Sequence, residues 1–110
     1  MTERYGMVIG LWPERVADDK RLHASVWPGV LDAMRRNGWC DFDSFLNEPE
    51  NLLIGTFSFD GPDFAAPAHA IGADPETQAW LRETDPCQAP FETRKPGKWW
   101  AHMENIFHMD

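Results

Sequence analysis

An aspartate and a histidine spaced by one helical turn are the residues of this sequence best suited to acid–base chemistry. Asp19 precedes His23 by four positions, so on a helix the carboxylate lies beside the imidazole, where it orients the ring and raises its pKa. Imidazole titrates near neutral pH and transfers protons in many enzymes. The plainer alternatives are a solvated ion pair or a histidine that is hydrogen-bonded in the core.

A proline close to this pair is expected to open the backbone beside the imidazole. Pro28 has no N–H to donate, so the helix predicted for residues 13–37 is interrupted there and the carbonyl of Ala24 loses its helical donor. A polar notch then lies one residue after His23. Trp27, which precedes the proline, is expected to form a wall of the pocket.

Tryptophan is frequent in this chain, with 6 residues among 110. Most of these rings, and those of the phenylalanines, are expected to fill the core or a subunit interface. One or two could instead stack on the apolar face of a ligand.

Other kinds of chemistry have little support. The sequence contains no GxGxxG, P-loop, GxSxG or HExxH motif, and Cys40 and Cys87 are isolated residues that we interpret as reduced packing residues. His102 and His108 would share one side of a strand, but no third ligand lies near them in the sequence. We therefore predict neither a metal site nor a cofactor.

The composition also limits the partners. The net charge is −8 and the longest basic run is Arg35-Arg36, so the positive surface of a nucleic-acid-binding protein is missing. The apolar stretch between Arg4 and Trp12 is too short for a signal peptide or a membrane span. We expect a cytoplasmic protein that acts on a small molecule and contacts neither nucleic acid nor membrane.

Apolar periodicity and turn residues predict one domain, residues 1–110, with strands and helices in a definite order. In chain order they are a strand at 5–11, a helix at 13–37 broken at Pro28, strands at 39–46 and 52–59, a helix in two pieces at 61–83, a loop at 85–97 and a strand at 99–109. In the first strand, bulky residues alternate with glycines and a valine, as in a strand that faces a cavity or another backbone.

This order is β-α-β-β-α-β, which predicts an α+β, ferredoxin-like fold with two helices on one face of a four-stranded antiparallel sheet. The strands are rich in Trp, Phe, Leu and Met, so the second sheet face needs a cover. Pairing two sheets face to face across a two-fold axis provides one. We therefore predict a homodimer.

The sequence also resembles the L-rhamnose mutarotase family over essentially its whole length. The resemblance is carried by RYGMVIGL, RLHASVWPGVLDAMRRNG, FLNEPENLLIGTF, TQAWLRETD and IFHMD, in which the H-x-x-V-W-P and N-L-L motifs are fairly specific. It implies a dimeric α/β barrel of ferredoxin-like protomers. It also implies a cofactor-free enzyme that interconverts the α and β anomers of a deoxyhexose pyranose.

The same resemblance implies roles for single residues. His23 stands at the position of the family's proton donor. Family members have tyrosines where this chain has Asp19 and Phe42, so two hydroxyl groups are missing here. A tryptophan pair that contacts sugar in the family corresponds to Trp80 and Leu81, which leaves Trp80 as the expected sugar contact.

We therefore predict a mutarotase for L-rhamnose or a related hexose. His23 is expected to act as the acid, and Asp19 either to orient it or to accept the anomeric proton. Trp80, Trp27 and Phe42 are expected to surround the sugar. The alternative is a non-catalytic monosaccharide- or small-ligand-binding protein on the same dimeric scaffold, which would leave anomer exchange at its uncatalysed rate.

Overall fold

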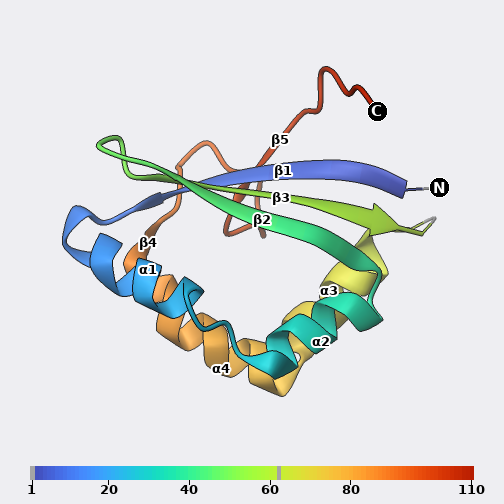
Figure 1. Ribbon diagram of the computed structural model, residues 1–110, viewed down its shortest axis with the longest axis horizontal. Helices are drawn as coiled ribbons and strands as arrows, with labels where there is room; N and C mark the ends of the chain where they lie inside the picture. The colour runs from blue at the N-terminus through green and yellow to red at the C-terminus, as the bar shows by residue number, and fades with distance from the viewer. Residues whose placement is uncertain (1, 62) are drawn as a thin grey trace.

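A computed structural model describes residues 2–61 and 63–110, with all helices on one side of an antiparallel sheet (Figure 1). The elements are β1 (Thr2–Leu11), η1 (Pro13–Arg15), α1 (Val16–His23), α2 (Pro28–Arg36), β2 (Trp39–Asn47), β3 (Leu52–Asp60), α3 (Ala65–Ala73), α4 (Pro75–Thr84), η2 (Asp85–Cys87), β4 (Gln88–Ala89) and β5 (Ala101–Met103). The predicted α+β class is confirmed.

The sheet is built around β1 and β3. Strand order is β2-β3-β1-β4, and β5 pairs with the same β1. β1 and β3 are antiparallel from Thr2↔Asp60 to Gly10↔Leu52. The small residues of β1 allow close approach, because a Cβ atom at Gly10 would lie 2.9 Å from the Ala89 carbonyl oxygen of β4. At Gly10, the prediction that the glycine side of this strand faces another backbone is confirmed.

The large side chains of the sheet point toward the helices and form the core. Ile9, Leu11 and Leu53 make one buried cluster. Toward the other end of the sheet, the fully buried ring of Phe57 stacks on Trp39 with ring centroids 4.1 Å apart. Apolar burial of this kind is the main source of stability in a small domain.

The backbone break near His23 is larger than the sequence suggested. We expected one helix interrupted at Pro28, but α1 ends at His23 and Pro28 is the first residue of a second helix, α2. The reason is that a residue before proline avoids helical geometry, and Trp27 is extended, with φ −64° and ψ 134°. His23 therefore lies at the C-terminal end of α1, where the helix dipole favours a positive charge.

The two-piece helix at 61–83 is confirmed as α3 and α4. Asp74 caps α4, because its carboxylate accepts a hydrogen bond from the Thr77 backbone N–H at 2.9 Å, and Pro75 follows at the first helical position. Glu76 in the first turn of α4 reaches α2, where its carboxylate accepts a 2.7 Å hydrogen bond from the backbone N–H of Gly29. This bond ties the start of α2 to α4.

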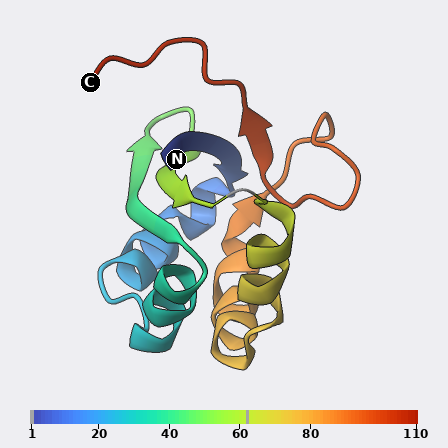
Figure 2. The same cartoon turned by 90° about the vertical axis from the view of Figure 1, so that its right-hand side faces the viewer.

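The last quarter of the chain differs from the prediction. The expected loop at 85–97 contains η2 and the short strand β4, and the expected strand at 99–109 is reduced to Ala101–Met103. Residues 104–110 leave the sheet on the side away from the helices (Figure 2), with Ile106, Phe107 and Met109 strongly exposed. The alternation of Met103, Asn105, Phe107 and Met109 predicts a strand, but a strand also needs a neighbouring edge. His102 and His108 therefore do not share a strand.

In the described part of the chain, none of the helices has both the length and the apolar character needed to cross a membrane.

Candidate functional site

A cavity of about 520 Å³ lies between the helices and the inner face of the sheet. The helices α1, α2, α3 and α4 and the long strands β1 and β2 contribute to its lining. His23 comes from the end of α1, Trp80 from α4, and Phe42 from β2. The volume falls in the range of about 300 to 1,000 Å³ that is usual for small-molecule sites.

His23 is held by one ring nitrogen. Its Nδ1 lies 2.9 Å from the backbone carbonyl oxygen of Asp19 and 3.3 Å from the Asp19 carboxylate oxygen Oδ2. Both neighbours are acceptors, so Nδ1 carries a proton and donates it. Among the described residues none bonds Nε2, which leaves that nitrogen free to exchange a proton with a ligand in the cavity.

The Asp19 carboxylate is buried behind the histidine. Asp19 is only 2% exposed, and its carboxylate oxygen Oδ1 has no hydrogen-bond partner among the described residues. Asp19 is not one of the residues that line the cavity. A buried carboxylate favours a nearby positive charge, so the pair stabilises the imidazolium form of His23.

The hydrogen bond from the Asp19 side chain is the largest cause that raises the pKa of His23 above its ordinary value, while burial acts in the opposite direction. We expect the Asp19→Asn variant to titrate His23 at lower pH, because the negative charge is lost while the backbone carbonyl contact remains. The measurement is the pH titration of the imidazole C–H resonances by NMR. The exposed His69 of α3 serves as an internal reference. An unchanged His23 titration would show that the carboxylate does not control its charge.

Two tryptophans and the histidine form one aromatic group. The Trp80 ring meets His23 edge-on at 6.3 Å and Trp27 edge-on at 5.3 Å between centroids. Trp80 is buried and lines the cavity, whereas Trp27 does not line it. Trp27 thus contacts a ring that lines the cavity, and its expected contact with the ligand stays a prediction.

Phe42 lines the cavity within a larger stack of rings. It lies parallel to Trp39 at 6.3 Å and to Phe57 at 5.4 Å. These parallel rings give the sheet side of the cavity a flat, apolar surface. Such a surface suits the C–H face of a small ring ligand.

The structure adds residues that the sequence did not indicate. Gln88 of β4 is buried and lines the cavity, and the Trp99 indole N–H donates a 2.7 Å hydrogen bond to its Oε1. Ser44, Thr77 and Thr84 add hydroxyl groups to the lining. The Trp99-Trp100 pair was the available signal: Trp100 lines the cavity and Trp99 fixes Gln88.

The lining can bind a polar ring ligand and exchange a proton with it. Among the described residues, no group of three His, Cys, Asp or Glu side chains is arranged to hold a metal ion. The site combines one titratable nitrogen, a few hydrogen-bonding groups and several aromatic faces. These features are typical of an enzyme site that could bind a small hydroxylated molecule and exchange a proton with it.

Comparisons with known proteins show the family to which this chain belongs. The family model for L-rhamnose mutarotase matches residues 4–109. The L-rhamnose mutarotase of Mesorhizobium japonicum is 31% identical over 118 residues, with 99% of each chain covered. That of Brucella anthropi is 27% identical over 104 residues, which are 94% of this chain and 77% of the relative. The chain therefore belongs to the L-rhamnose mutarotase family, and it is an enzyme of the isomerase class.

Solved structures agree on the fold. The crystal structure of an L-rhamnose mutarotase from Formosa agariphila superposes with a TM-score of 0.75 at 19% identity, covering 98% of this chain and 99% of that chain. A putative antibiotic biosynthesis monooxygenase from Caulobacter crescentus superposes with a TM-score of 0.59 at 10% identity, covering 82% of this chain and 81% of that chain. The predicted ferredoxin-like fold is confirmed.

Proposed function

We propose that this protein interconverts the α and β anomers of L-rhamnose, or of a closely related 6-deoxyhexose, with His23 as the proton donor. The observation that carries the proposal is the position of His23. Its Nδ1 is held by Asp19, its ring lines the large cavity, and its second nitrogen is free among the described residues. Membership in the L-rhamnose mutarotase family supports the choice of sugar.

The reaction requires one proton to be delivered and another to be removed. The His23 imidazolium gives its Nε2 proton to the ring oxygen as the bond from C1 to that oxygen breaks. The C1 hydroxyl loses its proton and becomes the aldehyde carbonyl. Rotation about C1–C2 and reversal of both transfers closes the ring from the other face. A general acid contributes a rate factor of about 10² to 10⁴.

The acceptor of the anomeric proton in this proposal is water. None of the described residues that line the cavity carries a carboxylate, and Asp19 is buried behind His23. The His23 side chain is 30% exposed, so solvent reaches the imidazole. Of the two roles expected for Asp19, we therefore propose the orienting one: it is a positioning residue that keeps His23 protonated.

The apolar lining favours a sugar with a hydrocarbon face. Trp80, Trp100 and Phe42 line the cavity from different elements, and an aromatic ring packs well against sugar C–H groups. The phenylalanine at position 42 offers no hydroxyl, so it suits a methyl group better than a hydroxymethyl group. This difference favours a 6-deoxy sugar over the corresponding hexose.

Polarimetry of freshly dissolved pure anomers tests the substrate. L-rhamnose, L-fucose and L-mannose are each followed with and without the protein. We expect the optical rotation of L-rhamnose to relax faster in proportion to protein concentration, and L-mannose, which adds one hydroxyl at C6, to respond less. A protein that binds L-rhamnose without speeding this relaxation would instead be the non-catalytic binding protein.

We further propose that the protein is a cytoplasmic homodimer. The apolar side chains of Ile106, Phe107 and Met109 are strongly exposed in the last residues of the chain. On the outer face of the sheet, Phe45 is also exposed. A second copy would cover both surfaces. The two cysteines are free, which fits a reducing compartment.

Sedimentation equilibrium of the full chain and of a chain ending at residue 103 tests the dimer. We expect the full chain to be dimeric at micromolar concentration and the shortened chain to dissociate at lower concentration, because it lacks the exposed apolar residues. A Phe45→Asp variant should also weaken the dimer if the sheets pair face to face. A full chain that stays monomeric at about 100 μM would contradict the proposal, since stable dimers of standard interface size associate more tightly.

A further inference from the structure

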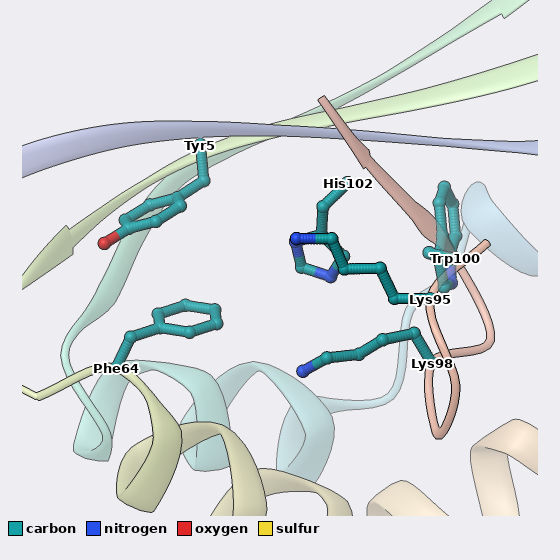
Figure 3. Close-up of a pocket in the computed structure, with 6 residues that line it drawn as sticks. All are labelled: Tyr5, Phe64, Lys95, Lys98, Trp100 and His102. Atoms are coloured by element: carbon teal, nitrogen blue, oxygen red, sulfur yellow. The ribbon is translucent and has the colours of Figure 1, made fainter. Parts of the chain in front are cut away.

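A second, smaller cavity of about 200 Å³ carries positive charge in this acidic protein. It is lined by Tyr5, Phe64, Lys95, Lys98, Trp100 and His102 (Figure 3). Within residues 2–61 and 63–110, neither Lys95 nor Lys98 has a carboxylate oxygen within 4.0 Å. By contrast, Lys20 pairs with Glu48 at 2.6 Å. Two ammonium groups therefore line one cavity without a counter-charge, in a chain of net charge −8.

The turn that carries the two lysines is held by Arg94. The guanidinium donates 2.8 Å hydrogen bonds to the backbone carbonyls of Lys98 and Phe91, and the Lys98 backbone N–H bonds to the Lys95 carbonyl at 3.1 Å. Arg94 also lies over the Trp99 ring at 6.0 Å. The lysine backbones are thus fixed relative to the strand β5 that follows.

Figure 3 shows the Lys98 side chain extending from this turn toward Phe64, with His102 between Tyr5 and Trp100. Burial lowers the pKa of His102, and the charges of Lys98 and Lys95 lower it further. These charges act on His102 because the three side chains are close. A bound anion would relieve this repulsion and accept hydrogen bonds from the ammonium groups.

The cavity is also suited to the apolar part of a ligand. The Tyr5 and Phe64 rings stack with their centroids 4.7 Å apart, and the Tyr5 hydroxyl donates a hydrogen bond to Glu3 at 3.1 Å. Trp100 lines this cavity and the large cavity that contains His23. The two cavities therefore adjoin at one tryptophan ring.

We propose that the smaller cavity binds the anionic group of an acidic sugar, a carboxylate or a phosphate ester, with Lys95 and Lys98 as its cationic partners. The inference rests on the proposed sugar chemistry of the adjoining cavity. An acidic sugar presents a charged group for the lysines and a C–H face for the aromatic walls. A neutral sugar has nothing to pair with the two charges.

NMR titration of the His102 imidazole resonance tests this assignment at constant ionic strength. The added compounds are D-glucuronate, D-glucose 6-phosphate, D-glucose and sodium sulfate, and the two acidic sugars distinguish carboxylate from phosphate. We expect at least one acidic sugar to shift His102 saturably, at concentrations at least about tenfold below those at which D-glucose acts. The Lys95→Gln/Lys98→Gln double variant should weaken that binding about tenfold or more, whereas Lys20→Gln should leave it unchanged.

Three results would overturn the proposal. Equal responses to D-glucuronate, D-glucose 6-phosphate and D-glucose would show that the cavity does not distinguish an acidic sugar from a neutral one. Sulfate binding as tightly as either acidic sugar would show a site for bare anions. Unchanged binding in the double variant would exclude the lysines. The readout is binding at His102, so it stands even if anomer exchange is not found.

Discussion

The His23→Ala variant should interconvert the anomers of L-rhamnose about 10² to 10⁴ times more slowly than the parent protein, because it lacks the general acid. Alanine also removes the partner of the buried Asp19 carboxylate, whose Oδ2 lies 3.3 Å from Nδ1 of His23. A His23→Gln variant therefore accompanies it, since glutamine keeps a donor near Asp19 but cannot act as an acid near neutral pH. Exchange is measured by NMR under equilibrium conditions.

Binding separates this effect from a loss of structure. Trp80 and Trp100 line the cavity, so quenching of tryptophan fluorescence by the sugar reports its affinity for each variant. We expect the affinity to change little while the rate falls, which is the pattern of an interaction needed in the transition state. His69→Ala, at an exposed position of α3, is the matched control and should exchange anomers like the parent. A His23→Ala protein as fast as this control would exclude His23 as the donor.

The Phe57→Ala variant should lose about 3 to 5 kcal/mol of unfolding free energy, because removing a buried ring leaves a cavity. Phe57 is 0% exposed and stacks on both Trp39 and Phe42, so several neighbours lose contacts at once. A loss of this size is a large part of the 5 to 15 kcal/mol typical of a domain. Urea unfolding followed by far-ultraviolet circular dichroism measures it.

A graded substitution makes this result specific. Phe57→Leu keeps part of the buried volume and should lose roughly 1 to 2 kcal/mol. The denaturant slope should stay the same in all three proteins, since the same surface is exposed on unfolding. If Phe57→Ala lost less than about 1 kcal/mol, the aromatic stack would not be the centre of the core. Because Phe42 belongs to that stack, the same variant should also weaken sugar binding.

The central strands and helix caps could be predicted from the sequence because their signals are local. Alternation marked β1, the four-residue turn marked the β2–β3 hairpin, and Asp74-Pro75 marked the start of α4. The C-terminal region could not be predicted in the same way. Residues 104–110 alternate like a strand, yet whether they pair depends on a neighbouring edge that periodicity does not report.

The site was partly predictable for the same reason. The Asp19–His23 contact follows from a four-residue helical spacing, and the structure places both residues as that spacing requires. Gln88 and Trp100 reach the cavity through the pairing of β4 and β5 with β1, which depends on distant parts of the chain. Trp27 has the extended backbone expected before a proline and contacts Trp80, so its place beside the cavity depends on α4, which is distant in the sequence.

The most direct test of the central claim is saturation transfer between the two anomeric protons of L-rhamnose at equilibrium. The parent protein, His23→Ala and His69→Ala are compared at the same catalytic concentration, with a protein-free sample beside them. We predict transfer that grows with the concentration of the parent and of His69→Ala, and that remains close to the protein-free level for His23→Ala. Transfer at the protein-free level for the parent would contradict this prediction.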